Sequence, residues 1–322
     1  MAKLEQVLGK VKACQRRLAK IPALLKRFRQ SVLAAACSGR LTADWREVNS
    51  DANAATYIET VRSKRPAKFQ DTSVRDDLDF PEIPESWSWT NLRFLITPEE
   101  AFCYGVVQPG ENDPKGALLV RAGDLKNGRA DTRALRHIPK SIHEAYRRSQ
   151  LKGGEILVTV VGAGIGETAL AQQECAGYNI ARAVAKLPVR EFDARYVRHW
   201  LTTSRAVTWM KSDPREATRP TLNLEQLQTL PVPVPPLPEQ QEIVRRLEAL
   251  FALADRIEAR CAKAQAQVDR LTPSLLARAF AGKLVPQDPA DEPAAALLER
   301  IRAKNGPATS AGPTKSAAYP EV

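Results

Sequence analysis

The chain lacks any long hydrophobic run. Among its 322 residues, no apolar segment approaches the ~20 residues that a membrane-spanning helix needs. The N-terminal sequence MAKLEQVLGK also lacks the apolar core of a secretory signal peptide. We therefore predict a cytoplasmic protein without a membrane partner.

Cysteine is scarce, and its spacing in the sequence does not indicate disulfide or zinc pairs. The sequence has five cysteines, an odd number, and no two of them form a CxxC pair. Neither a disulfide framework nor a zinc site is expected from such spacing. We predict reduced, buried thiols at Cys14, Cys37, Cys103, Cys175 and Cys261.

Recognisable catalytic motifs are missing too. The histidines His137, His143 and His199 do not form HExxH or any other metal-ligand spacing. There is no GxSxG, no P-loop and no group of acidic residues around a lysine of the nuclease type. A self-sufficient adenine methyltransferase would need an NPPY-like tetrapeptide, which is absent as well. We predict a non-catalytic protein without cofactor or metal, whose chemistry, if any, belongs to partners.

Positive charge is plentiful, and it is unevenly distributed. The formal net charge is +11. Residues 1–40 carry +9 and residues 85–235 carry +4, while the rest of the chain carries −2. A basic protein of this kind is expected to bind a polyanion or an acidic partner. The alternative is that the N-terminal charge only solvates one face of a helix.

Two long amphipathic helices are predicted, one near each end of the chain. In residues 3–37, apolar residues recur at spacings of three, four and seven, with Pro22 as a kink or restart and Gly39 as the stop. The second helix is expected from Pro238 to about Ala281, followed by Gly282.

An internal repeat relates these two helices. A shift of 243 residues places SVLAAACSGRLT (31–42) on SLLARAFAGKLV (274–285), with six of twelve residues identical. Each helix would be ~50–65 Å long at 1.5 Å per residue, which is more than the intervening domain can cover. Because both apolar stripes must be buried, we predict an antiparallel coiled coil.

The organisation expected from these patterns is an α+β fold, in which one mixed α/β domain is bracketed by the two helices. Short apolar runs such as ALLVRAG and GEILVTVVG are typical of strands, and SIHEAYRRSQ and DARYVRHWLTTSRAVTWMK of helices. The predicted segments are a first long helix (1–41), a polar connector with a short helix at 52–62 (42–84), the mixed domain (85–235), a second long helix (236–285), and a short helix at 294–303 with a disordered tail (286–322).

The sequence GAGIG at 162–166 permits a second hypothesis. It follows an apolar strand, as a dinucleotide-binding turn does. However, its spacing is GxGxG, no long helix is expected after it, and no acidic residue stands about twenty positions further on. We favour a tight turn between strands over nucleotide binding.

Several motifs resemble one family. The stretch PVPVPPLPEQQEIVRRLEALFALADRIEAR, followed by SLLARAFAGKLVP, resembles a conserved region of type I restriction–modification specificity subunits. The stretch IPALLKRFRQSVLAAACSGRLTADWRE resembles the end of the family's other conserved region. Between them, PESWSWTNL, VRAGDL, LKGGEILVTVVGAGIG and YNIARAVAKL follow the order of one target recognition domain, at 85–235.

The resemblance implies a DNA-recognition subunit that works with partners. These would be double-stranded DNA, methyltransferase subunits and, through the complex, restriction endonuclease subunits. The family pattern has two recognition domains, whereas this sequence begins inside the first conserved helix and resembles the C-terminal half. Three alternatives stay open: a homodimer, pairing with a separately encoded half, or a truncated, inactive remnant. A further alternative is a coiled-coil scaffolding protein with non-specific DNA binding.

Two groups of residues are candidates for DNA contact. Base edges are read by hydrogen-bonding side chains, and Lys and Arg on phosphates fix the register. The candidates are Arg121, Lys126, Arg129, Arg133, Arg136, Tyr146, Arg147 and Arg148 in the first group, and Lys211, Arg215, Arg219 and Thr221 in the second.

Overall fold

The computed structural model describes residues 2–74, 81–212, 221–286, 290 and 292–305. The chain divides into two compact units, one of residues 21–259 and the other of residues 1–20 and 260–322. The longest helix, α10 (Leu237–Phe280), contributes to both units. The expected disorder of the tail concerns residues 306–322, which lie outside the described residues.

In the smaller unit, α1 (Ala2–Leu18) pairs with the last part of α10, and α11 (Ala294–Asn305) follows. The Gln15 amide donates to Asp269 over 2.8 Å, and the Cys261 thiol contacts the Leu18 carbonyl at 3.7 Å. Rising numbers on α1 meet falling numbers on α10, so the two helices are antiparallel. This agrees with the expected coiled coil, and the short helix near residue 294 is confirmed.

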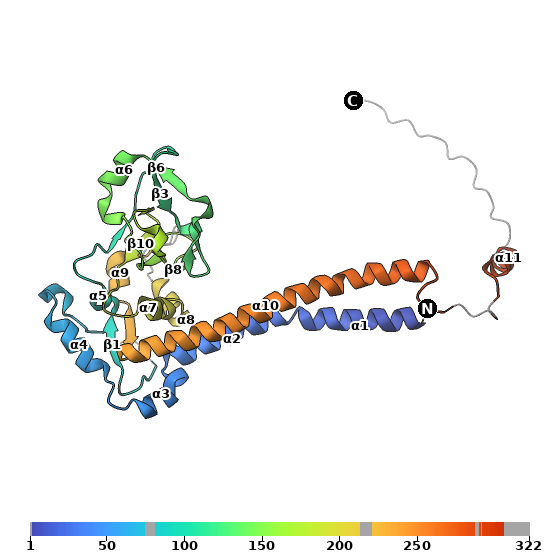
Figure 1. The fold of residues 1–322 in the computed structure, drawn as a ribbon, viewed down its shortest axis with the longest axis horizontal. Helices are drawn as coiled ribbons and strands as arrows, with labels where there is room; N and C mark the ends of the chain where they lie inside the picture. Colours follow the sequence, from blue (N-terminus) through green and yellow to red (C-terminus); the bar gives the residue numbers. More distant parts are fainter. Residues whose placement is uncertain (1, 75–80, 213–220, 287–289, 291, 306–322) are drawn as a thin grey trace. The chain divides into compact units, whose positions relative to one another are not determined.

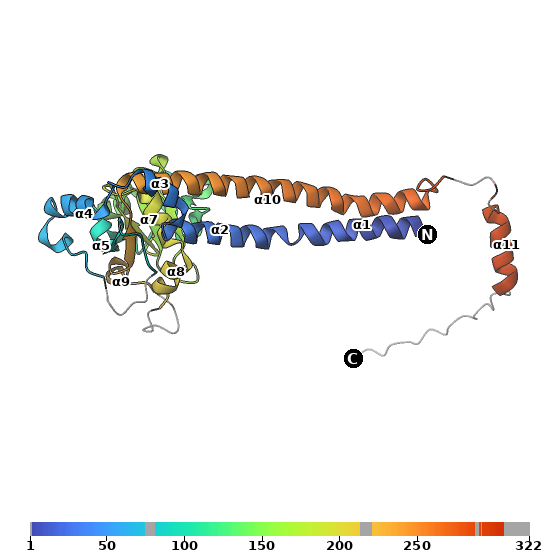
Figure 2. The ribbon, with the colours of Figure 1, turned by 90° about the horizontal axis from the view of Figure 1, so that it is seen from below.

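In the larger unit, α2 (Ile21–Cys37) runs beside the first part of α10 (Figures 1 and 2). Arg29 donates to Asp255 at 2.6 Å and to Glu258 at 2.8 Å. The predicted restart at Pro22 is confirmed, because α1 ends at Leu18 and α2 begins at Ile21. Proline is tolerated in this first turn because its missing N–H would have no helical partner there.

The two repeated helix ends have the same backbone structure. Gly39 and Gly282 both adopt the left-handed conformation, with φ of 76° and 67°. The Gly39 N–H donates to Ala36, and the Gly282 N–H donates to Ala279, a pair related by the same shift of 243 residues. Glycine ends both helices because a side chain is strained at such φ values.

The connector between α2 and the central domain contains α3 (Ala43–Val48) and α4 (Ala54–Ser63). The predicted short helix is therefore confirmed as α4. Its residues Ala54, Ile58 and Val61 are buried in the main hydrophobic core. Part of this segment is thus firmly packed, although the polar composition of 42–84 predicted a loose connector.

The central domain contains eleven strands among its described residues. In chain order they are β1 (Ser88–Asn91), β2 (Cys103–Tyr104), β3 (Ala117–Val120), β4 (Leu125–Lys126), β5 (Arg129–Ala130), β6 (Arg136–Ile138), β7 (Ile156–Thr159), β8 (Thr168–Leu170), β9 (Asn179–Ile180), β10 (Val184–Leu187) and β11 (Pro231–Val234). Its helices are α5 (Leu92–Leu95), α6 (Lys140–Ala145), α7 (Ala194–Leu201), α8 (Ser204–Met210) and α9 (Leu224–Gln228). Short 3-10 turns lie at 40–42, 67–69, 122–124, 132–134, 147–149 and 173–175.

These strands form three sheets. The largest has the order β2-β10-β7-β8-β5-β4, a second has the order β6-β3-β9, and β1 pairs with β11 alone. Pairing is antiparallel except between β3 and β9 and between β5 and β8. The α+β class predicted from the sequence is confirmed.

The proline-rich strand β11 is stabilised by α7. Proline lacks a donor, so it suits a strand that pairs on only one side. The carbonyl of Pro231 accepts from Trp200 and that of Pro233 accepts from Tyr196, each over 2.7 Å. The segment PVPV is therefore held by two buried aromatic side chains of α7.

The start of α10 is a buried polar junction. Glu239 is fully buried and accepts hydrogen bonds from Thr42 at 2.6 Å, Arg46 at 2.5 Å and the Trp87 indole at 2.8 Å. Gln240, equally buried, accepts from the Asp193 N–H and donates to Pro235, both at 2.9 Å. The LPEQ motif thus joins the connector, the central domain and α10.

The glycine turn GAGIG connects two antiparallel strands, β7 and β8. Gly162 and Gly166 have φ of 90° and 89°. No helix follows the turn, because residues 168–170 form β8. The tight-turn interpretation is confirmed, and the helix N-terminus that a dinucleotide-binding turn requires is not present at this point in the chain.

All five cysteines are free, but the prediction of buried thiols was wrong for three of them. Cys37 and Cys175 are buried, Cys103 and Cys261 are half-buried, and Cys14 is exposed. Cys14 lies on α1, so its exposure follows from its position on the helix surface. A search of the described residues finds no helix that is long and apolar enough to span a membrane.

Candidate nucleic-acid interface

Three candidates lie at an edge hairpin of the largest sheet. Strands β4 and β5 are joined by Asn127 and Gly128, both with positive φ (52° and 75°), as a two-residue type I′ turn requires. Lys126 and Arg129 flank this turn, and Arg133 follows in the next 3-10 turn. All three side chains belong to exposed residues.

Two aspartates hold the basic side chains of this hairpin region. Asp131 accepts from Arg133 at 2.8 Å and from Lys126 at 3.3 Å, while Asp124 pairs with Arg121 at 3.0 Å. The Arg133 guanidinium, by its hydrogen bonds, is the main cause of a strongly lowered pKa of Asp131. The cations of these pairs are 47–86% exposed, whereas the aspartates are only 12–15% exposed. The basic groups can therefore contact a further anion from the solvent side while the aspartates hold them in place.

A second set of candidates lies near α6. Arg147 and Arg148 are exposed in the 3-10 turn that follows α6. Tyr146 is half-buried and packs against Ile138 and its neighbours, so much of its ring belongs to the core. Arg136, on β6, is also half-buried and donates to the Gly110 carbonyl. Within this set, the two exposed arginines are best placed to meet a ligand.

Arg148 also lines a cavity of about 240 Å³ together with Lys68, Arg93, Phe69 and Phe102. The Phe69 ring has the Lys68 ammonium 5.1 Å and the Arg93 guanidinium 5.9 Å from its centroid. Aromatic rings beside cations are a common combination where nucleic-acid bases and phosphates bind. Lys68 and Arg93 were not among the predicted residues: Lys68 lies in a connector of acidic composition, and Arg93 precedes the basic cluster at 121–148.

The second predicted group is described only in part. Lys211 is exposed at the end of α8, and Thr221 forms an isolated antiparallel bridge with Val161. Arg215 and Arg219 lie outside the described residues. The bridge places Thr221 beside the glycine turn between β7 and β8.

One described member of each predicted group, Arg129 and Thr221, lies near an end of β8, and the two ends are opposite. Arg129 is in register with Leu170, the last residue of β8, whereas the glycine turn and Thr221 adjoin its first residue, Thr168. The structure thus separates Arg129 from Thr221. A single contact surface that includes both residues would have to extend along this strand.

The histidines lie in hydrogen-bonded or buried surroundings. His143 contacts the Asn179 side chain at 2.6 Å and the Gln150 amide at 3.2 Å. His199 is 4% exposed, and burial, together with Arg198 and Arg195, lowers its pKa to about 3. Across the part of the chain that the structure describes, no three His, Cys, Asp or Glu residues are grouped as a metal site would require.

Known proteins resemble this chain in both sequence and fold. The type I restriction enzyme EcoBI specificity subunit of Escherichia coli is 40% identical over 312 residues, covering 94% of this chain and 61% of the relative. The EcoDI specificity subunit of Escherichia coli is 32% identical over 314 residues, covering 94% and 65%. The chain therefore spans roughly three fifths of the length of these curated relatives.

A solved structure supports the fold. A chain from work on complex assembly and conformational transition of the type I R-M system matches with a TM-score of 0.53 at 18% identity, covering 87% of this chain and 60% of that chain. Residues 112–265 match the family model of the type I restriction modification DNA specificity domain. The chain belongs to the family of type I restriction enzyme specificity subunits.

Proposed function

We propose that this chain is the DNA sequence-recognition subunit of a type I restriction–modification complex and reads one half of a bipartite DNA site. One observation carries the proposal: the match to the DNA specificity domain, at residues 112–265, contains all twelve candidate DNA-contact residues. The chain itself is proposed to be non-catalytic and to act in the cytoplasm, without cofactor or metal.

Within the interface, the exposed cations are proposed to contact phosphates. Arg121, Lys126 and Arg133 are held at the surface by aspartates, and Arg147 and Arg148 extend from a 3-10 turn. Such contacts fix register without reading sequence. Base reading is assigned to Lys211 and Thr221, which are exposed, and to Arg215 and Arg219, which lie outside the described residues.

Docking of a methyltransferase subunit is proposed along the helix pair of the larger unit. Leu24 on α2 and Leu253 and Ile257 on α10 are 58%, 43% and 39% exposed. Leu253 and Ile257 are four residues apart, so they share one face of α10. Exposed apolar side chains in such a row are typical of a protein contact. Restriction endonuclease subunits would join through the resulting complex.

The free end of α10 is proposed to accept a second recognition domain, from another copy of this chain or from a separately encoded half. The internal repeat relates Cys37 to Phe280 and Thr42 to Val285. Cys37 and Thr42 are 4% and 0% exposed in the larger unit, whereas Phe280 and Val285 are 90% and 50% exposed. A second domain would bury the end of α10 as the first buries the end of α2.

The test is co-expression with a methyltransferase subunit, followed by sequencing of methylated sites in the cell's DNA. Wild-type chain should give one methylated motif, and deletion of residues 85–235 should abolish it. The matched control retains the domain and removes only residues 306–322, and it should leave the motif unchanged. A stable complex that methylates no defined motif would favour the scaffolding alternative and contradict the proposal.

A further inference from the structure

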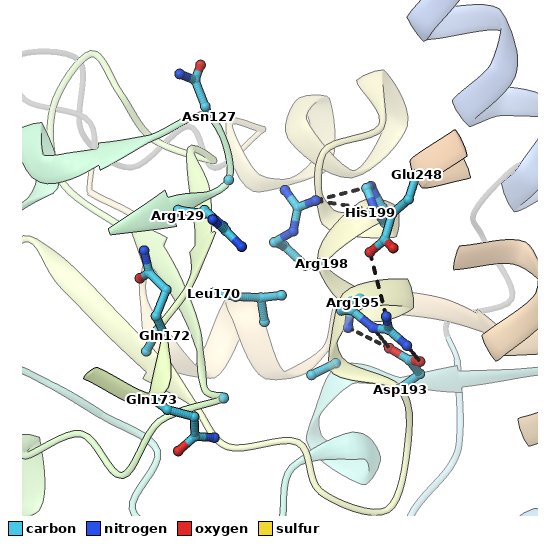
Figure 3. A pocket seen from close by; sticks show the side chains of 14 residues that line it. Asn127, Arg129, Leu170, Gln172, Gln173, Asp193, Arg195, Arg198, His199 and Glu248 are labelled. Carbon is cyan, nitrogen blue, oxygen red and sulfur yellow. Dashed lines mark hydrogen bonds and ion pairs between the residues drawn. The ribbon is translucent and has the colours of Figure 1, made fainter. Parts of the chain in front are cut away.

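The larger unit contains a second cavity, of about 560 Å³, lined by three arginines. Figure 3 shows Arg129 and Gln172 on the strand side and Arg195, Arg198 and His199, from α7, on the opposite side. Glu248 of α10 completes the wall. We call this site the arginine cavity, after Arg129, Arg195 and Arg198. The last two arginines are not among the candidates predicted from the sequence.

The positive charges of the arginine cavity are only partly balanced. Arg195 is neutralised, because it donates to Asp193 at 2.9 and 3.2 Å and lies 3.6 Å from Glu248. Among the described residues, no carboxylate pairs with Arg198 or Arg129. The Arg198 Nη2 atom instead lies 3.3 Å from the ring nitrogens of His199, and its Nε atom is buried without a hydrogen-bond partner. Arg129 and Arg198 thus have no carboxylate in direct contact, and the three arginines of the wall outnumber its two carboxylates, Asp193 and Glu248.

Partial burial makes the unpaired charge of Arg198 more unfavourable. Burial lowers the pKa of Arg198, with Glu248 acting in the opposite direction. Its neighbour His199 is 96% buried, as its 4% exposure implies, and cannot supply a negative charge. A partly buried cation that contacts no carboxylate is unfavourable unless an anion reaches it. The cavity is therefore better suited to an anion than to a neutral ligand.

Gly128, in the hairpin between β4 and β5, leaves room for the Arg198 guanidinium. A Cβ atom on Gly128 would lie 2.6 Å from the Arg198 Nη1 atom. Gly128 also has a φ of 75°, which disfavours any residue with a side chain. The turn between β4 and β5 thus approaches Arg198 closely, and it holds Arg129 on the same cavity.

We propose that the arginine cavity binds a phosphate group between Arg129 and Arg198. Guanidinium groups bind phosphate through paired, charge-assisted hydrogen bonds, and two of them match the charge of about −1 to −2 that phosphate groups carry. Gln172, whose side chain bonds to the Ala130 backbone, and the His199 ring also line the wall. A backbone phosphate of DNA and a free phosphate monoester share this chemistry. Binding of a DNA phosphate rests on the proposed function, whereas binding of a free phosphate monoester does not depend on it.

The first experiment titrates the full chain with inorganic phosphate at low ionic strength and follows binding by calorimetry. Wild type should bind phosphate saturably, and Arg198→Gln and Arg129→Gln should each raise the Kd for phosphate by about ten-fold or more. Arg129 is exposed on the hairpin, so its replacement tests the site without risk to the core. The control Arg256→Gln removes an exposed charge from α10, outside the cavity, and should bind like wild type. Equal affinity in all four proteins would overturn the proposal.

The second experiment repeats the phosphate titration with saturating duplex DNA. If the ligand is a DNA backbone phosphate, DNA competes, and Arg198→Gln lowers the slope of log K against log salt by about 1. If DNA leaves the phosphate affinity unchanged, the DNA source is excluded and the cavity is a site for a free monoester. A chain that binds phosphate but no DNA would overturn the proposed function while leaving the arginine cavity standing.

Discussion

At the scale of single residues, the most informative positions are buried polar side chains. Glu239 and Gln240 lie in the motif LPEQ, which the sequence places at the start of an amphipathic helix. The partners of Glu239, Thr42 and Trp87, are 197 and 152 residues away in sequence, and Gln240 accepts from Asp193, 47 residues away. The first turn of α10 is therefore held by residues from distant parts of the chain. The same holds for Arg198, whose cavity is formed by elements far apart in the chain.

Replacement of Glu239 by Gln should destabilise the larger unit by about 3 kcal/mol, because the partly buried guanidinium of Arg46 loses its fully buried charged partner. The free energy of unfolding from urea titration measures this. Glu258→Gln is the matched control on the same helix, because Glu258 is 52% exposed and pairs with Arg29. The control should lose less than about 1 kcal/mol. Equal losses in both variants would refute the role of the buried junction.

His199 should make the stability of the protein depend on pH. Its pKa is about 3 in the folded protein and 6.5 in an ordinary environment. Between these values the unfolded chain binds a proton that the folded protein does not, so the free energy of unfolding falls as pH falls below 6.5. The contribution is constant above that pH, and its slope below is at most about 1.4 kcal/mol per pH unit.

The measurement compares wild type with His199→Asn by urea unfolding at pH 7.5 and pH 5.0. At pH 7.5 the variant should be less stable, because it loses the ring contact with Phe251. At pH 5.0 this deficit should shrink by up to about 2 kcal/mol. Only in the wild type does His199 bind a proton on unfolding, which lowers the free energy of unfolding at that pH. A deficit that is the same at both pH values would rule out a depressed pKa for His199.

At the scale of elements, periodicity was a good guide to helices and a poor one to short strands. The bounds of the long helices were predicted to within two residues, because many apolar positions repeat along them. Strands β2, β4, β5 and β9 have only two residues each, which is too short for an alternating pattern. The pair Asn127-Gly128 is itself a hairpin signal in the sequence. Sheet order, however, depends on contacts distant in sequence, so the cavity beside this hairpin could not be located beforehand.

The two glycine helix ends should differ in their tolerance of a side chain. Both Gly39→Ala and Gly282→Ala force a left-handed alanine, which costs about 1–2 kcal/mol. At Gly39 the new Cβ would also lie 2.4 Å from the Pro84 Cγ atom. We expect Gly39→Ala to lower the free energy of unfolding by at least twice as much as Gly282→Ala. Thermal and urea unfolding, followed by circular dichroism, measure both losses, and similar values would argue against the Pro84 contact.

At the scale of the whole molecule, the repeat is the feature that the sequence predicted best. Its shift of 243 residues is reproduced by matching hydrogen bonds at the two helix ends. One of these ends is buried against a recognition domain, and the other exposes Phe280. What the repeat cannot specify is the second domain, because the apolar surface at Phe280 accepts any partner of complementary shape.

A homodimer would give the target a symmetry that can be measured. Two copies present the same recognition domain twice, so the methylated motif should be two inverted copies of one half-site with a fixed gap. Methylated sites are mapped in cells that express this chain with a methyltransferase subunit and no other specificity chain. An asymmetric motif under these conditions would exclude the homodimer.

The gap of that motif should depend on the length of the paired helices. Leu18 and Cys261 face one another across α1 and α10, so seven residues inserted at each lengthen both helices equally. Seven helical residues add about 10 Å, which corresponds to about three base pairs of DNA. The half-sites should stay the same, since the insertions lie outside residues 85–235, while the gap grows by about that amount. Retained methylation with an unchanged gap would mean that the helices do not set the distance between recognition domains.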